Sequence, residues 1–113
     1  MTPVHIIDVA HPPRHPDEVE DALMAGWSYV RNSSTLRVLK IVHGYGSHGR
    51  GGSTKSHVRN WVFKNRFKFR NTIDGEDYAL HNAATEALRK ELGPYEDLDL
   101  NTANQGVTIV WVK

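Results

Sequence analysis

The sequence predicts an α/β fold, a two-layer sandwich in which a mixed four-stranded sheet packs against two helices and an inserted third helix is added. Short runs rich in β-branched residues alternate along the chain with segments whose apolar residues recur at helical spacing. One such segment separates the first two runs, which is typical of a βαβ unit with parallel strands. With 113 residues the chain can form one hydrophobic core. We therefore expect a single domain over residues 1–113.

The N-terminal part of the chain predicts this βαβ unit element by element. Residues 4–9, VHIIDV, have the composition of a buried strand, and the prolines of the following AHPPRHP require a loop. Pro16 suits the first position of a helix, and acidic residues fill its first turns, where the helix dipole favours negative charge. We expect this helix over residues 16–31, with Val19, Leu23, Trp27 and Val30 on its apolar face. The almost continuous apolar run of residues 36–42 predicts a central strand.

The C-terminal part predicts two helices and two strands. Ser53 or Thr54 can cap a second helix, and Asp74 can cap a third helix that Gly93 and Pro94 end. The expected elements are, in order, a helix with Val58, Trp61 and Val62 toward the core, a half-exposed strand at 67–70, a helix over 75–92 with Leu80, Ala84, Leu88 and Leu92 on one side, a polar loop at 95–105 and a last strand at 106–113.

Positive charge is concentrated in the middle of the chain. No Asp or Glu occurs from Ala22 to Ile73, although the formal net charge of the whole chain is only +1. A positive field of this kind suits a polyanion, and we expect nucleic acid as the partner; the alternative is a solvated basic face without a partner. The segment contains ten of the fourteen cationic residues: Arg31, Arg37, Lys40, Arg50, Lys55, Arg59, Lys64, Arg66, Lys68 and Arg70.

The composition excludes several other classes of protein. The chain has no cysteine, so disulfides and thiolate metal sites are excluded. No apolar stretch approaches the roughly 20 residues that span a bilayer, and the N-terminus lacks the pattern of a signal peptide. We therefore expect a cytoplasmic monomer that does not associate with membranes.

A glycine-rich segment, HGYGSHGRGG at residues 43–52, follows the predicted central strand. Glycines let backbone amides approach a ligand closely, and free amides at the start of a helix can bind phosphate. The spacing matches neither common nucleotide-binding motif. The segment therefore predicts a phosphate cradle, with the candidate ligands Gly44, Tyr45, Gly46, His48, Arg50, Gly52, Lys55 and Arg59.

Three further residues could supply acid–base chemistry beside this cradle. Asp8 and His11 come at the end of the first strand and His43 closes the second, so adjacent parallel strands would bring them together. An imidazole oriented by a carboxylate is suited to phosphodiester cleavage. The alternative is a histidine that only hydrogen-bonds the backbone. The sequence requires no cofactor and predicts no metal ligands, although a divalent ion such as Mg²⁺ remains compatible with the reaction.

The stretches KIVHGYG, STKSHVRNWV and GVTIVWVK resemble the Smr (small MutS-related) domain family, over residues 4 to about 70 and 106–113. The resemblance implies a fold similar to the C-terminal domain of a bacterial translation initiation factor, and nicking endonuclease activity on DNA or RNA. It also implies that His43, Gly44 and Gly46 match the family's H-G-x-G motif, with Tyr45 at the variable position.

The match is partial at the family's first motif, L-D-x-H-G. Asp8 fits, but Ala10 stands at the histidine position and His11 at the glycine position. A helical insert at about 71–105 also departs from the family and offers a surface for a protein partner. Three functions follow: a nicking endonuclease with His43 as general acid or base and Asp8 orienting it or the substrate, a non-catalytic nucleic-acid-binding module, or a protein-interaction domain that uses the inserted helix.

Overall fold

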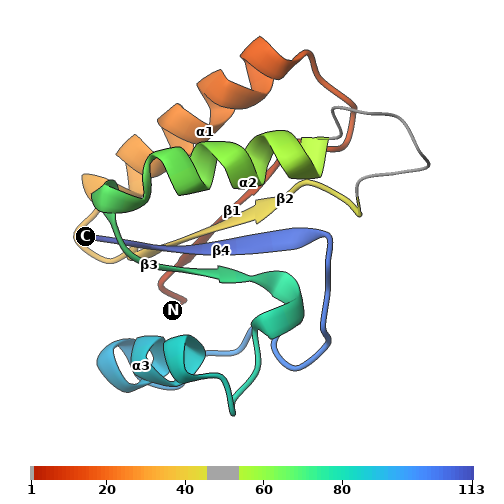
Figure 1. The fold of residues 1–113 in the computed structure, drawn as a ribbon. Coiled ribbons are helices and arrows are strands. Elements are labelled where there is room, and N and C mark those ends of the chain that lie inside the picture. Colours follow the sequence, from red (N-terminus) through yellow and green to blue (C-terminus); the bar gives the residue numbers. More distant parts are fainter. Residues whose placement is uncertain (1, 46–53) are drawn as a thin grey trace.

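A mixed four-stranded sheet forms the centre of the protein (Figure 1). The computed structural model describes residues 2–45 and 54–113. The strand order is β1 (Val4–Asp8), β2 (Val38–Val42), β4 (Val107–Val112), β3 (Phe69–Asp74). β1 and β2 are parallel, and β4 is antiparallel to both of its neighbours. The predicted parallel βαβ unit and the mixed sheet are confirmed.

Helices α1 (Pro16–Arg31) and α2 (Thr54–Lys64) cover one face of the sheet, as Figure 1 shows. Both form where the apolar spacing predicts them, and Pro16 occupies the first turn of α1. The side chain of His15 caps α1 by accepting from the Asp17 amide, while Glu18 accepts from the His15 amide. The core on this face joins residues of α1, α2 and the sheet, among them Val19, Leu23, Leu39, Val58, Trp61 and Val110.

Helix α3 (Ala83–Leu92) covers the opposite face of the sheet. A second apolar cluster forms beneath it from Val4, Val38, Ile73, Tyr78, Leu88, Tyr95 and Ile109. The α/β fold class is therefore confirmed, and the inserted helix adds a layer to the sheet and its first two helices. Because both faces are covered, the central strand β2 is buried along almost its whole length.

The predicted start of the third helix is wrong. Asp74 ends β3 and is followed by a short 3₁₀ helix, η2 (Gly75–Asp77), and the Asp74 side chain makes no capping hydrogen bond. Asn82 is the cap instead, since its Oδ1 accepts from the Thr85 amide at 3.0 Å. Leu80 consequently lies outside the helix and is exposed rather than in the core.

The predicted strand at 67–70 is also displaced. Residues Arg66–Lys68 form a 3₁₀ helix, η1, and the strand begins only at Phe69, which is buried. Phe67 consequently lies in η1 and not in the strand, and its side chain is on the surface with 68% of its area exposed.

Lys40 does not belong to the basic surface, although it lies in the basic segment of the sequence. Its side chain is buried on the central strand and forms ion pairs with Asp97, at 2.6 Å, and with Asp99. Burial alone would lower the pKa of Lys40, but its hydrogen bonds to the two carboxylates outweigh burial and raise it. Tyr78 extends this network by bonding Tyr95 at 3.0 Å and Asp97 at 3.1 Å. These contacts fix residues 95–99 against the sheet.

Candidate functional site

His43 lies directly after β2 and is almost completely buried, with 2% of its area exposed. Its Nδ1 is 2.7 Å from the Gly44 carbonyl oxygen, and its Nε2 is 2.8 Å from Thr108 Oγ1. A carbonyl oxygen can only accept, so Nδ1 carries the proton and Nε2 accepts from the Thr108 hydroxyl. Both ring nitrogens therefore have protein partners.

The partly buried Arg59 continues this chain of hydrogen bonds. Arg59 Nε donates to Thr108 Oγ1 at 3.2 Å, and its two terminal nitrogens donate to the Glu76 carboxylate at 3.0 and 2.7 Å. The bidentate hydrogen bonds from Arg59 hold the pKa of Glu76 at about 2. Arg59, which the sequence offered as a phosphate ligand, is thus engaged with Glu76, Thr108 and the Val107 carbonyl.

The surroundings of His43 favour its neutral form. Burial lowers the pKa of His43 to about 4, against the hydrogen bond to Gly44, which raises it. The positive charges of Arg59 and Lys55 lower it further. At neutral pH His43 is an uncharged, internally bonded imidazole.

Asp8 and His11 form an exposed pair at the end of β1. His11 Nδ1 is 3.0 Å from Asp8 Oδ2, and Asp8 Oδ1 also accepts from the amides of Ala10 and His11 at 2.8 and 3.0 Å. Burial would raise the pKa of Asp8, but these hydrogen bonds lower it. An ionised carboxylate only accepts, so Nδ1 of His11 carries a proton and Nε2 is the nitrogen left for other partners. The His11 side chain is 74% exposed.

The chain segments that follow β1 and β2 lie close together at Ala10 and Gly44, which are both small residues. Asp8 is paired with Val42 in the parallel register, and a Cβ added at Gly44 would lie 3.8 Å from the Cβ of Ala10. Gly44 has φ +79°, a conformation that glycine adopts readily. The sheet edge thus places the Asp8–His11 pair beside the turn that follows His43. Asp8 hydrogen-bonds His11, whereas the ring of His43 bonds Gly44 and Thr108.

Only part of the predicted phosphate cradle lies within the described residues. The amides of His43 and Gly44 both donate to the Gly106 carbonyl, at 2.9 and 3.1 Å. Gly44 therefore shapes the turn, and its amide is already used. Tyr45 is 69% exposed beside it, and Lys55 lies in the first turn of α2. The other candidates, Gly46, His48, Arg50 and Gly52, lie outside the described residues.

Comparison with known proteins identifies a similar fold. No protein-family model matches the chain, and no curated protein matches it. Among solved structures, the Smr domain of Thermus thermophilus MutS2 superposes with a TM-score of 0.53 and 13% sequence identity, covering 97% of this chain and 96% of that one. The fold is similar to that of an Smr domain. The expected resemblance to Smr domains is thus confirmed at the level of the fold.

Two residues of the candidate site were not singled out from the sequence. Thr108 lies 65 positions after His43, and Glu76 lies 17 positions after Arg59. Thr108 stands in a strand of otherwise apolar residues, VTIVWV, which is the one local sign that a buried polar partner is needed there. In the described part of the chain, no group of three or more His, Asp or Glu residues could hold a metal ion, and no helix is long and apolar enough to cross a membrane.

Proposed function

We propose that the protein is a nucleic-acid-binding module of the Smr type that cleaves phosphodiester bonds at the sheet edge formed by Asp8, His11 and Gly44. The observation that carries the proposal is the exposed Asp8–His11 pair. Asp8 fixes the His11 ring through Nδ1 and leaves Nε2 facing away from the carboxylate. An imidazole held in this way can act as a general acid or base.

The roles of the two histidines differ in this proposal. His11 Nε2 accepts the proton of the attacking hydroxyl, and Asp8 holds the ring and stabilises the imidazolium that results. His43 positions the site: it fixes the Gly44 turn against Thr108 and does not exchange protons with the substrate. Lys55, near His43, supplies positive charge for the phosphate.

The test compares His11→Ala with the wild-type protein and with a control variant, His15→Ala, on a panel of labelled single-stranded, duplex and branched DNA and RNA. His11→Ala should abolish cleavage, by about 10²- to 10⁴-fold, and leave binding unchanged. His15→Ala is the matched control, since His15 is also exposed but caps α1. Cleavage by His11→Ala at the wild-type rate would overturn the assignment of His11.

A non-catalytic nucleic-acid-binding module is the second candidate. It is favoured by the burial of His43 and by the use of the Gly44 amide inside the protein. In this case no substrate of the panel is cut at any pH, but affinity falls steeply with salt because bound phosphates release counterions. Absence of both cleavage and salt-dependent binding would exclude both candidates.

A further inference from the structure

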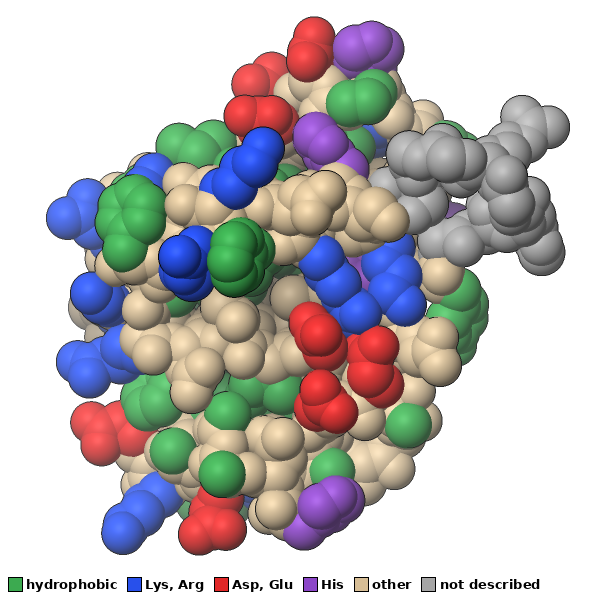
Figure 2. All heavy atoms as spheres, in the orientation of Figure 1, with side chains coloured by type: hydrophobic (Ala, Val, Ile, Leu, Met, Phe, Trp, Pro, Cys, Tyr) green, Lys and Arg blue, Asp and Glu red, His purple; other side chains and the backbone are tan. Residues whose placement is uncertain are grey.

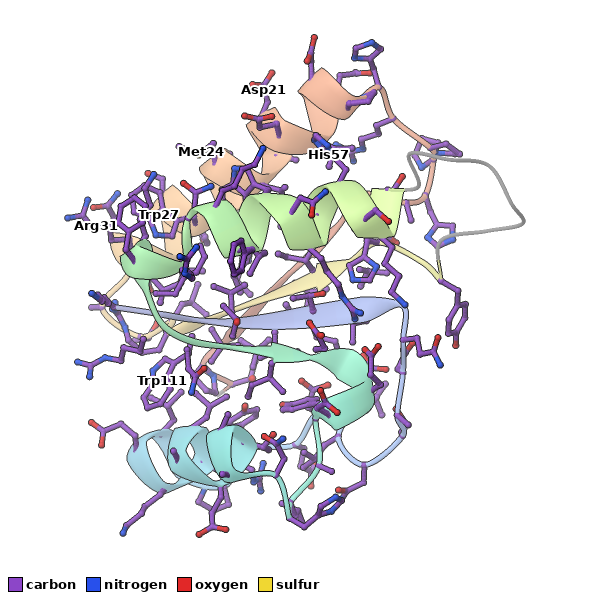
Figure 3. All side chains as sticks on the ribbon, viewed as in Figure 1. Asp21, Met24, Trp27, Arg31, His57 and Trp111 are labelled. Atoms are coloured by element: carbon purple, nitrogen blue, oxygen red, sulfur yellow. The ribbon has the colours of Figure 1, made fainter. Side chains whose placement is uncertain are left out.

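Aromatic and cationic side chains gather at the end of the molecule where α1 and α2 finish, away from the Asp8–His11 pair. Figure 2 shows Lys and Arg side chains along this edge, while acidic side chains on the same face lie near the start of α1, around η2 and over α3. Trp27 and Arg31 mark the place in Figure 3. We call this surface the aromatic–cationic patch; it consists of Trp27, Arg31, Phe63, Arg66, Phe67 and Lys68.

The two phenylalanines of the patch are unusually exposed. Phe63 and Phe67 leave 63% and 68% of their area open to solvent, although apolar residues of α2 that pack inward are buried. Two large aromatic side chains four positions apart, at the end of α2 and in η1, form an exposed apolar feature rimmed by charge. Such a feature is costly unless a partner covers it.

Cations lie over the rings of the patch. The Arg66 guanidinium is 4.0 Å from the centroid of Phe63, and the Lys68 ammonium is 6.0 Å from Phe67 and 4.7 Å from Trp27. Arg31 lies 5.4 Å from the Trp27 centroid. These contacts hold positive charge over the faces of the rings.

The charge of the patch is not neutralised by carboxylates. Within the described residues, Arg31, Arg66 and Lys68 form no ion pair, whereas Arg59 is paired with Glu76 and Lys40 with Asp97. All five cations lie in the segment 22–73 that contains no Asp or Glu, so the fold makes the difference by bringing Asp97 to Lys40 and Glu76 to Arg59. The patch therefore presents uncompensated cations next to exposed rings.

We propose that the aromatic–cationic patch binds single-stranded nucleic acid. Bases stack on Phe63 and Phe67, and Arg31, Arg66 and Lys68 contact the adjoining phosphates. Stacking on aromatic rings requires unpaired bases, so the patch selects single strands or single-stranded regions over continuous duplex. This inference rests on the proposed nucleic-acid binding and names the class of substrate.

The arrangement of α2 connects the patch to the proposed cleavage edge. The helix has 11 residues, a length of about 16 Å, and runs from Lys55, near His43, to Phe63 in the patch. A strand held at the patch can continue along α2 to the sheet edge. Charge alone would also suit an anionic membrane, but the exposed apolar part of the patch is limited to Phe63 and Phe67, since Trp27 packs against the core and the remaining apolar residues of α2 face it.

The experiment measures binding of fluorescent single-stranded and duplex oligonucleotides of equal length by anisotropy. The variant Phe63→Leu/Phe67→Leu keeps apolar volume but removes the stacking surfaces. It should lose at least about tenfold in affinity for single strands and change duplex affinity by less than about twofold. Leu98→Ala, a change at an exposed apolar residue beyond α3, is the matched control.

A second variant tests the cations. Arg66→Gln/Lys68→Gln should reduce the slope of affinity against salt for single strands by about one to two phosphate contacts. Lys90→Gln on α3 should leave the slope unchanged. If the wild-type protein binds nucleic acid and both patch variants keep its affinity and its slope of affinity against salt, this inference is overturned while the proposed function stands.

Two other outcomes bear on the proposed function and on the nature of the partner. If the wild-type protein binds neither single-stranded nor duplex oligonucleotides, the proposed function fails and the inference fails with it. If the protein binds vesicles of anionic phospholipid instead, and Phe63→Leu/Phe67→Leu removes that binding, the patch is a membrane surface and the inference is overturned.

Discussion

The neutral state of buried His43 predicts how the stability of the protein depends on pH. The folded imidazole has a pKa of about 4, whereas an imidazole in an unfolded chain titrates near 6.5. Between these values the unfolded state binds a proton that the folded state does not bind. The free energy of unfolding therefore falls as the pH is lowered through this window, and it is independent of His43 above it.

The size of this effect follows from the two pKa values. Lowering the pH from about 7.5 to about 4.5 should cost on the order of 2–3 kcal/mol of stability from His43 alone. The carboxylates with a lowered pKa, Asp8, Glu76 and Asp99, also stabilise the fold. Their contribution is lost mainly below the ordinary pKa of a carboxyl group. Most of the pH range over which His43 lowers the stability lies above that pKa, so the two effects can be separated.

The assay is urea denaturation at a series of pH values, for the wild-type protein and for His43→Gln. The amide of Gln can accept from Thr108 and has no proton equilibrium in this range, so the variant should lose less stability across the window. His81→Gln, a change at an exposed histidine, should retain the wild-type profile. Identical pH profiles for wild type and His43→Gln would refute the assignment of a buried neutral imidazole, as would an NMR titration of His43 with a pKa above about 6.

Three further predictions concern the elements that surround the site. Lys40→Met leaves Asp97 and Asp99 buried without their cation, so it should cost about 3–5 kcal/mol in urea denaturation, and adding Asp97→Asn and Asp99→Asn should recover part of it; a loss below about 1 kcal/mol would contradict the buried network. Gly75→Ala would place a Cβ 2.0 Å from the Asn104 carbonyl oxygen and should lower the stability by at least about 2 kcal/mol. Gly93→Ala strains a backbone at φ +82° but its Cβ meets open space, so it should cost less; thermal denaturation that ranks the two in the opposite order would refute this. Asn82→Ala should cost about 1 kcal/mol, since it removes the cap of α3, while Asp74→Ala should cost less; equal losses in denaturation would contradict the assigned helix start.

The sequence predicts correctly those helices and strands whose determinants lie within a few residues of one another. The helix over residues 16–31 has the expected bounds because Pro16, the acidic first turn and the apolar spacing act within a few residues. The central strand and the last strand were predicted from continuous apolar runs, which reflect burial on both faces.

The errors arise where partners are distant in the sequence. Asp74 has the residue type of a helix cap, but the following Gly75 packs against the Asn104 and Val107 backbone and Glu76 pairs with Arg59, so the chain turns there before a helix can begin. Lys40 has the appearance of a surface cation because Asp97 and Asp99 lie more than fifty positions away. No local pattern reports such contacts.

The candidate site shows the same limit. The sequence predicted that Asp8 and His11 act together, and their spacing of three residues is short enough for one turn to join them. The burial of His43 depends on Thr108 and Arg59, which come from β4 and α2. Whether a histidine at a strand end is exposed is decided by the elements that later fold over it, and those were visible only in the structure.

The place of β4 in the sheet has a consequence for how the protein can be made. Among the described strands β4 comes last in the sequence, yet it lies between β2 and β3 and is the only neighbour that β3 has among them. Residues 107–112 must therefore emerge from the ribosome before β3 can join the sheet. Until then one edge of β2 has no partner strand. Loss of this strand should therefore leave a βαβ fragment whose unpaired edge makes it prone to aggregation.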